Sequence, residues 1–370
     1  MTELMQAHRQ WMSRAPDERF TDLLDMQDFK RRIRHASNSS VLSSRALTVL
    51  PVEDDARGLR VTARTEDSVL TPTHWSFGQL CSFASPGNSP ASYFRDTNMP
   101  VPMIADCLNY NLRFTRGVED IGILSTMNDD GVELRSVNGP NYGRVYDADV
   151  VDALVDRFGD GVSGTWRVPG EFGQRVAITK ANTTLFASDR DMFVFLADEE
   201  NRIELPNRRA GRMGSFARGF FVGNSEVGKS SLFAGFFLFD YVCCNRIIWG
   251  ADQYTEVRIR HTKGAPDRWL EEVTPVLQDY SEGSAKPVVQ AIEDARSKRI
   301  EDELSSFLAK RFGKQMARAI AAIHETEEGR PIETLWDVTV AATAHARSVK
   351  NTDKRMEIER TAGELLKLAA

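Results

Sequence analysis

The chain has 370 residues, of which 41% are hydrophobic and 27% are charged, and its formal net charge is −6. These values are ordinary for a globular protein, and the length suits one large domain or two closely packed ones. No apolar run approaches the ~20 residues that span a bilayer, and the N-terminus carries no apolar signal core. We therefore expect a cytoplasmic protein that makes no membrane contact. The acidic balance also argues against a protein that coats nucleic acid with its whole surface.

The four cysteines show no metal-ligand spacing, and two of them are adjacent, so reduced thiols are expected at Cys81, Cys107, Cys243 and Cys244. In chain order, residues 2–29 have the apolar pattern of an amphipathic helix interrupted at Pro16. A polar linker follows at Ala36–Ser44. Next come expected strands at Leu47–Val52 and Leu59–Arg64, a helix capped by Thr73 that runs to Phe83, and a helix at Pro102–Phe114.

Turn residues predict an antiparallel arrangement in the middle of the chain. Asp130-Gly131 is a strong hairpin signal between Ile121–Met127 and Val132–Val137, and Asp147–Phe158 has one apolar stripe typical of a helix. A strand meander is expected at Arg175–Lys180, Thr184–Ala187 and Met192–Ala197, with further strands at Gly219–Val222, Arg246–Trp249 and Glu256–His261. Apolar residues occur nearly all round Leu232–Cys244, which predicts a buried central helix.

From Asp267 onward the pattern is helical, and glycine and proline separate the segments. The expected helices are Arg268–Tyr280, Lys286–Gly313, Lys314–Glu325, Ile332–Val349 and Asp353–Leu368. The predicted fold class is α+β, a mostly antiparallel sheet with a buried central helix followed by a helical C-terminal region. The predicted divisions are an N-terminal helix and linker over 1–44, an α+β core over 45–266, and a helical region over 267–370.

One segment matches the phosphate-binding loop pattern G-x-x-x-x-G-K-[ST], through Gly223, Gly228, Lys229 and Ser230. Such a loop cradles phosphates with backbone N–H groups and begins a helix in a parallel sheet. Here the flanking strands predict an antiparallel sheet, and the second acid that would hold Mg²⁺ is not where that fold places it. The sequence therefore favours a glycine-bounded turn over a nucleotide site.

Several blocks, in order, resemble another pattern: LRSVNGPNYGRVYDADVVDAL (134–154), SDRDMFVFL (188–196), RGFFVGNSEVG (218–228), FLFDYVCCNRIIWGA (237–251), VRIRHTKGAP (257–266), LWDVTVAATAHARS (335–348) and ERTAGELL (359–366). Together they resemble the phage- and plasmid-borne "domain of unknown function 932" family over nearly the whole chain. The Asn-Ser-Glu-Val-Gly core is characteristic of that family, whereas Gly223 and Lys229 are not usual in it. The resemblance implies residence on a mobile element and implies no established reaction.

Polar residues of these blocks form two candidate groups. The first group is a predicted polar site, whose acidic side chains could supply the hard oxygen ligands that Mg²⁺ or Mn²⁺ prefers. Its candidate residues are Asp189, Asp191, Asn224, Ser225, Glu226, Arg260 and His261. Turn and helix-cap chemistry explains several of the same residue types. Glu226, Arg260 and His261 are expected to meet, with Glu226 in the positive first turn of the central helix. The second group would bind nucleic acid through arginine forks and aromatic stacking: Arg135, Tyr142, Arg144, Arg208, Arg209, Arg212 and Arg258.

Three functions stay open at this point. The leading one is a phage- or plasmid-encoded protein of DNA metabolism, for example of DNA recombination. It would bind nucleic acid, above all single-stranded DNA, as a homo-oligomer. The second is an enzyme, either a nucleotide hydrolase using Lys229 and Ser230 or a metal-dependent hydrolase using Asp189, Asp191, Glu226 and His261. The third is a host-interaction factor whose helical C-terminus docks a partner.

Overall fold

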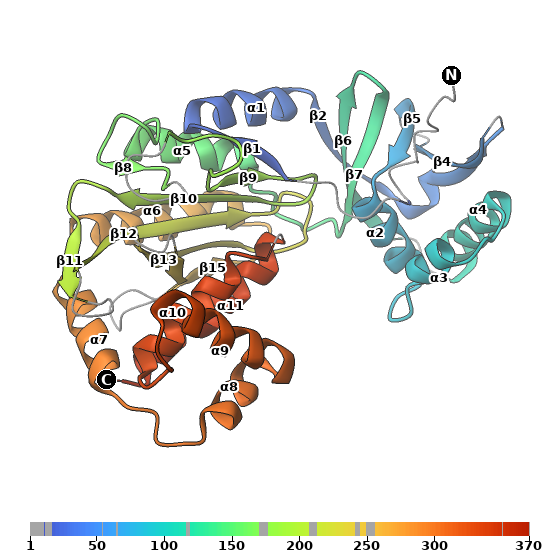
Figure 1. Cartoon of the computed structure of the whole chain (residues 1–370). Coiled ribbons are helices and arrows are strands. Elements are labelled where there is room, and N and C mark those ends of the chain that lie inside the picture. The colour runs from blue at the N-terminus through green and yellow to red at the C-terminus, as the bar shows by residue number, and fades with distance from the viewer. Residues whose placement is uncertain are drawn as a thin grey trace, which may run out of the picture.

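The computed structural model describes residues 11, 17–53, 55–63, 66–115, 119–169, 177–206, 213–240, 245–248, 256–349 and 351–369. These residues form two β-sheets with helices packed on them, so the predicted α+β class with a largely antiparallel sheet is confirmed (Figure 1). The part of the chain described here has nine strands in the larger sheet, which we call sheet A, and six in sheet B.

Sheet A has the order β1-β9-β10-β12-β13-β14, and β8, β11 and β15 pair with β10, β12 and β13. Its pairings among the described residues are antiparallel. Its strands are β1 (Glu18–Phe20), β8 (Trp166–Arg167), β9 (Leu185–Ala187), β10 (Met192–Asp198), β11 (Ile203–Pro206), β12 (Met213–Asn224), β13 (Leu232–Asp240), β14 (Asn245–Ile248) and β15 (Val257–Ile259).

Sheet B has the order β2-β6-β7-β5-β4-β3, and its β5–β7 pair is parallel. The strands are β2 (Ser37–Ser43), β3 (Leu47–Val52), β4 (Asp55–Ala63), β5 (Glu66–Pro72), β6 (Asp120–Asn128) and β7 (Gly131–Asn138). The hairpin predicted around Asp130-Gly131 is the β6–β7 pair, and Gly131 has the positive φ of 120° that its turn requires. The predicted polar linker at 36–44 is wrong, because its serines form the edge strand β2 against β6.

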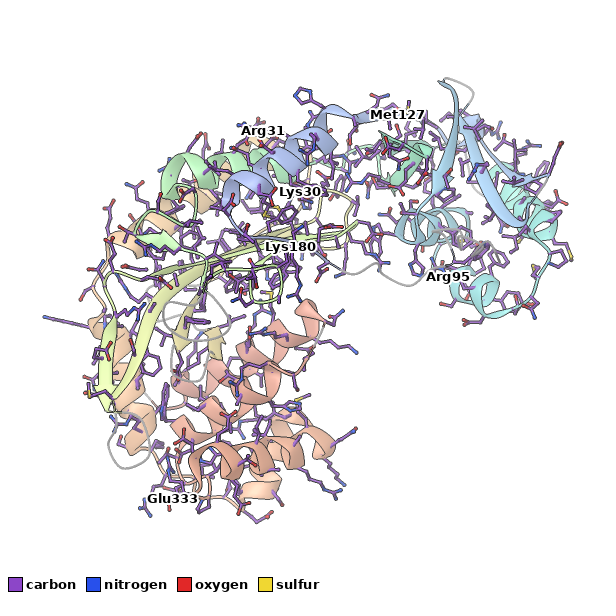
Figure 2. All side chains as sticks on the ribbon, turned by 45° about the horizontal axis from the view of Figure 1, so that its top comes forward. Lys30, Arg31, Arg95, Met127, Lys180 and Glu333 are labelled. Carbon is purple, nitrogen blue, oxygen red and sulfur yellow. The ribbon has the colours of Figure 1, made fainter. Side chains whose placement is uncertain are left out.

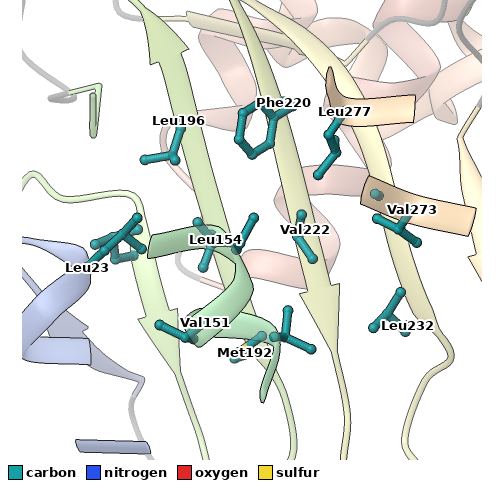
Figure 3. Packing of buried hydrophobic residues seen from close by; sticks show 14 of the residues in the cluster. Leu23, Val151, Leu154, Met192, Leu196, Phe220, Val222, Leu232, Val273 and Leu277 are labelled. Carbon is teal, nitrogen blue, oxygen red and sulfur yellow. The ribbon is translucent and has the colours of Figure 1, made fainter. Parts of the chain in front are cut away.

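Helices cover both faces of sheet A (Figure 1). On one face lie α1 (Leu23–His35), α5 (Asp147–Phe158) and α6 (Ala265–Glu282), and α5 has the predicted bounds. Figure 3 shows Leu154 of α5 and Leu277 of α6 facing Leu196 and Phe220 of the sheet in this core. The C-terminal helices are α7 (Lys286–Ser297), α8 (Leu304–Phe312), α9 (Lys314–Glu328), α10 (Leu335–Ala346) and α11 (Thr352–Lys367).

One face of sheet B packs on α2 (His74–Ala84), α3 (Ala91–Asp96) and α4 (Val101–Tyr110), which continues into the π-helical turn η2 (Asn111–Thr115). A short 3₁₀ turn, η1 (Ser44–Ala46), joins β2 to β3. Thr73 caps α2 as predicted, with its hydroxyl accepting from Ser76 N at 3.0 Å. The sequence did not predict α3.

The predicted central helix at 232–244 is wrong, because its described part is the strand β13. Alternate residues of β13 face opposite cores: Phe233 and Phe237 lie in an aromatic cluster, whereas Leu232 and Phe236 lie under α5 and α6. A strand covered on both faces is apolar throughout, so its composition resembles that of an enclosed helix. Residues 241–244 lie outside the described part of the chain.

Several other predicted helices and strands differ from the observed ones in their bounds. The N-terminal helix is α1, which begins only at Leu23 and continues through the basic run to His35, and residues 1–10 and 12–16 lie outside the described part. The helix expected at 286–313 is two helices, separated at 298–303. The strand expected at 175–180 is not formed over residues 177–180, and 175–176 lie outside the described part. The remaining C-terminal helices are present, and α6 shares a core with sheet A.

Candidate functional site at the junction of the two sheets

The segment that matches the phosphate-loop pattern is a hairpin connection. β12 ends at Asn224, β13 begins at Leu232, and residues 225–231, which we call the joint loop, turn the chain between two antiparallel neighbours. The turn closes with Gly228 N donating to Ser225 O at 3.2 Å. Since a strand follows the loop, there is no helix N-terminus here to receive a phosphate. The geometry therefore supports the turn that the sequence favoured.

Three of the four residues that define the pattern have a structural role. A Cβ atom on Gly223 would lie 2.3 Å from Cζ of Phe233, whose ring covers this glycine from the neighbouring strand. Gly228 has φ +87°, and a Cβ there would lie 2.7 Å from Asn138 Nδ2. Lys229 Nζ donates to Asp191 Oδ2 at 2.6 Å, so Lys229 is not the exposed first-turn residue that a helix would present. The match to the nucleotide motif thus follows from packing and turn geometry.

The joint loop forms hydrogen bonds that connect sheet A to sheet B and to its helix α2. The carbonyl oxygen of Val227 accepts from Trp75 Nε1 at 3.1 Å, from Gln79 Nε2 at 2.8 Å and from Asn138 Nδ2 at 3.3 Å. Trp75 and Gln79 lie one turn apart on α2, and Asn138 ends β7. The loop is therefore a fixed contact between two layers that are distant in sequence.

A cluster of buried charges lies behind the joint loop. Lys30 of α1, labelled in Figure 2, donates to Asp147 Oδ2 at 2.7 Å, and Asn224 Nδ2 donates to Asp147 Oδ1 at 2.8 Å. Glu226 pairs with Arg135 of β7 and accepts from Asp147 N at 3.2 Å. We call Lys30, Arg135, Asp147 and Glu226 the buried charge cluster, and it links α1, α5, β7 and the joint loop.

Glu226 does occupy the positive end of a helix, although not the predicted one. Its carboxylate accepts from the first N–H of α5, where the helix dipole favours a negative charge. Burial alone would raise the pKa of Glu226, but Arg135 and Lys30 outweigh burial and hold that pKa at about 2. Burial raises the pKa of Asp147 to about 6 in spite of Lys30, and the negative Glu226 adds to the rise.

Glu226, Arg260 and His261 do not form the predicted site. Glu226 is sealed in the buried charge cluster, whereas Arg260 is exposed. The His261 ring stacks on Tyr142, with centroids 5.0 Å apart, and its Nδ1 lies 3.2 Å from Gly143 O. The acidic partner expected for Arg260 instead binds Arg135, which β7 supplies from 91 residues upstream.

The remaining polar candidates are committed to the fold. Asn224 also donates to Val145 O at 2.9 Å, and Ser225 Oγ donates to Arg190 O at 2.6 Å. Asp191 accepts from Ser188 Oγ at 2.6 Å as well as from Lys229, and Asp189 lies 3.4 Å from Arg190 Nε. In the described ranges, no group of three or more His, Cys, Asp or Glu is placed to hold a metal ion. The contacts therefore give the predicted Mg²⁺ or Mn²⁺ site no support.

Two of the seven predicted nucleic-acid contacts are buried, and a third is partly buried. Arg135 and Arg144 are 6% and 9% exposed, and Arg144 donates to Glu226 O and to Ser136 Oγ. Tyr142 donates to Ser225 O at 2.9 Å. The contacts give these three predictions no support, because the three side chains form hydrogen bonds at the junction of the sheets. Arg258 remains about half exposed and pairs with Glu256 at 2.5 Å. Residues 207–212, which include Arg208, Arg209 and Arg212, lie outside the described part of the chain.

A cavity of about 620 Å³ lies beside the joint loop, between α2, α3 and the end of β7. We call it the arginine pocket, because Arg95 of α3 and Arg190 of the β9–β10 turn both line it, with His74, Trp75 and Asn138. Arg95 Nη2 donates to His74 O at 2.6 Å, and Arg190 Nη2 lies 3.2 Å from His74 Nδ1. The lining residues that the structure describes include no carboxylate.

Two guanidinium groups line the arginine pocket, and one of them, that of Arg190, also pairs with Asp189, which is not among the lining residues. Burial lowers the pKa of His74 to about 4, and repulsion from Arg95 and Arg190 adds to this shift. Burial also lowers the pKa of Arg95, with Arg190 contributing in the same direction. At neutral pH the imidazole is therefore neutral between two guanidinium groups. Arg190 is 5.7 Å from the centroid of Trp75, which adds an aromatic surface to the cationic one.

The sequence did not single out His74, Trp75, Arg95 or Arg190 as a site. The spacing of Trp75 and Gln79 on a predicted helix was the available signal, but Arg95 belongs to a helix that was not predicted. No family model, no curated protein and no solved structure matches the chain. The resemblance found in the sequence blocks therefore stays a prediction. No helix in the described ranges is long and apolar enough to cross a membrane.

Proposed function

We propose that this protein binds single-stranded nucleic acid, with DNA as its natural ligand, and that the arginine pocket takes one phosphate and its neighbouring base. One observation carries the proposal: Arg95 and Arg190 meet in a cavity whose described lining has no carboxylate. Desolvated guanidinium groups gain most from an anion that accepts charge-assisted hydrogen bonds. A phosphate fits this requirement, because its oxygens match the planar fork of arginine.

His74 supplies a further donor for such a ligand. Arginine can only donate, so the contact of Arg190 with His74 Nδ1 requires that this nitrogen accepts. The neutral imidazole then carries its proton on Nε2, where it can donate to a phosphate oxygen. The pocket thus combines two cations with a neutral donor, which together suit a singly charged phosphodiester.

The base is expected to contact the aromatic wall of the pocket. Trp75 and Phe83 line the cavity, and base–aromatic stacking contributes about 1–3 kcal/mol per base in proteins that bind single strands. A volume of about 620 Å³ falls in the usual range for small-ligand sites, so one nucleotide unit fits. In a duplex the bases are already stacked on each other, and this favours single strands for the pocket.

The family resemblance sets this activity in phage or plasmid DNA metabolism. The net charge of −6 agrees with a local contact, because a pocket needs only local positive potential. We place the protein in the cytoplasm, where the free thiols of Cys81 and Cys107 would stay reduced. The hydrolase alternatives rank lower, since the joint loop lacks a following helix and the acids of the metal set already bind Lys229 and Arg135.

The test is fluorescence anisotropy with labelled oligothymidylates of increasing length, measured over a series of salt concentrations. Arg95→Ala should weaken binding by about tenfold or more, since a hydrogen bond to a charged group is worth ~1.5–3 kcal/mol. It should also lower the salt slope by about 0.7, the value for one lost phosphate contact on a single strand. Arg95→Lys keeps the charge without the fork and should fall between the parent and Arg95→Ala.

The matched control is Arg299→Ala. This exposed arginine, between α7 and α8, pairs with Glu333, and Figure 2 shows Glu333 far from Arg95. Arg299→Ala should bind as the parent does, and far-UV melting should show that Arg95→Ala remains folded. The proposal is wrong if the parent fails to bind at low salt, or if Arg95→Ala and Arg299→Ala bind equally. Competition by duplex DNA of the same length should be much weaker than competition by the single strand.

A further inference from the structure

An apolar stripe runs along the outer face of α4 and η2. Met103, Tyr110 and Phe114 are 57%, 62% and 73% exposed, and Cys107 between them is exposed too. The rings of Tyr110 and Phe114 are in contact, with centroids 5.2 Å apart, so both lie on one side of the helix. We call Met103, Cys107, Tyr110 and Phe114 the outer stripe.

The opposite side of the same helix is already buried. Ile104 and Leu108 pack with Leu112 in the core under sheet B. A helix on the surface of a monomer normally has a polar outer face, so apolar residues on both sides indicate a second packing surface. Single exposed apolar residues are common, but a continuous stripe along one helix is typical of a contact with another molecule.

The spacing of the outer stripe is that of a helix pair. Its members follow one another by four, three and four residues, which is the a/d repeat of helices that pack side by side. The stripe is also symmetric about the midpoint between Leu108 and Asn109. In an antiparallel pair of identical helices, Met103 lies opposite the partner's Phe114, and Cys107 lies opposite the partner's Tyr110.

The flanking charges agree with the same arrangement. Asp106 and Arg113 are both exposed, and both precede a stripe residue by one position, so they border the stripe on one side. When identical helices pair antiparallel, these flanking positions face each other. Asp106 then lies near the partner's Arg113 at one end, and the same opposite-charge pair recurs at the other end. In a parallel pair Asp106 would instead lie near the partner's Asn111, and the opposite charges would not meet.

We propose that the outer stripe is the contact between two copies of this chain, packed antiparallel about a two-fold axis beside Leu108. We infer a second copy as the partner because the surface is self-complementary. When one helix is reversed against the other, apolar positions face apolar positions, and Asp106 faces Arg113. The 10 residues of α4 span only about 15 Å of helix, and η2 adds one π-helical turn. The contact is therefore at the small end of specific interfaces, and the dimer should be weak and reversible.

Sedimentation velocity over a range of protein concentrations, without nucleic acid, tests this directly. The parent should show concentration-dependent dimerisation, and Phe114→Glu should remain monomeric at every concentration. Val69→Glu is the control, because Val69 is 51% exposed on β5, away from the stripe, and this variant should dimerise as the parent does. Circular dichroism should show that both variants keep the parent's fold, since neither side chain is buried.

A charge exchange distinguishes this geometry from any other use of the stripe. Asp106→Arg and Arg113→Asp should each weaken dimerisation by about tenfold, because each places like charges opposite one another. The double variant Asp106→Arg/Arg113→Asp should restore parental affinity. A short bismaleimide should cross-link the parent dimer, and Cys107→Ser should abolish that product. A parent that stays monomeric, or a double variant that is no better than the single ones, would overturn the proposal.

Discussion

Glu226→Gln is the substitution that most sharply separates a structural from a functional role for the Asn-Ser-Glu segment at the end of β12 and the start of the joint loop. Glu226 is 4% exposed and accepts from Arg135, which is 6% exposed, and from the first N–H of α5. Glutamine keeps the size and one acceptor oxygen, so the hydrogen bond from Asp147 N can persist. The change removes the negative charge, however, and leaves the Arg135 guanidinium buried without its partner.

The expected loss of stability follows from that unpaired charge. Removing one member of a buried ion pair costs about 3–5 kcal/mol, much more than loss of a pair at the surface. With ~2.1 cal/mol/K of unfolding entropy per residue over the whole chain, this corresponds to a fall in melting temperature of about 4–6 °C. If Glu226 were a functional group on a stable scaffold, as the sequence left open, the variant would melt at the parental temperature.

Thermal melting at pH 7, followed by circular dichroism, is the assay. Glu333→Gln is the matched control, because Glu333 is half exposed and 3.6 Å from Arg299, and its loss should shift the melting temperature by less than 1 °C, as about 0.5 kcal/mol implies. The double variant Arg135→Met/Glu226→Leu should recover much of the loss, since it leaves no unpaired charge. Parental melting of Glu226→Gln would refute the argument.

The pH dependence has a defined sign. The folded-state pKa of Glu226 is about 2, below its ordinary value of 4.5, so its contribution is present above pH 4.5 and is lost as pH falls toward 2. The difference between the parent and Glu226→Gln should therefore shrink below pH 4.5, and it should level off only above about pH 6, because Glu226 also raises the pKa of Asp147. Asp147 acts in the opposite sense, because its raised pKa favours folding below 3.8 and loses that contribution as pH rises through about 6.

Three further outcomes are expected. Lys229→Ala should lower stability by about 1–3 kcal/mol in a urea titration, because it removes a bond to the buried carboxylate of Asp191, and ATP binding should be absent from parent and variant alike. Phe237→Ala should lower the free energy of unfolding by about 3–5 kcal/mol, because the ring is buried. Gly219→Ala should also destabilise the protein, because its Cβ would lie 2.3 Å from the Phe237 ring. If either variant melts at the parental temperature, this packing is wrong. In NMR titrations the pKa of His74 should be about 4. This residue therefore favours folding most above pH 6.5 and progressively less as the pH falls toward 4. Added oligonucleotide should raise the pKa of His74.

Local chemistry was enough for much of the secondary structure. Asp130-Gly131 specified a hairpin because only a glycine accepts the φ found there, and the apolar stripe of Asp147–Phe158 specified a helix with one buried face. The polar turn between Ala187 and Met192 was likewise found from its aspartates. In each case the determining contacts lie within a few residues along the chain.

The β13 strand and the site depended on contacts between distant residues. Apolar residues all round 232–240 are compatible with a buried helix or with a strand covered on both faces, and only the pairing with β12 decides between them. Opposite Gly219 and Gly223, that pairing places the rings of Phe237 and Phe233, which explains the glycines without a phosphate. Residue types alone carry no such information about partners.

For the charged residues, too, the sequence indicated which residue types matter, and only the tertiary structure decided their partners. The sequence identified Glu226 and the arginines of the middle blocks as unusual, and it indicated that a helix dipole would favour the carboxylate. It could not say that the helix would be α5 or that the partner would be Arg135, because β7 and the joint loop meet only when the two sheets join. The arginine pocket is likewise a property of that junction, since Arg95 and Arg190 approach each other only after α3 and the β9–β10 turn are placed.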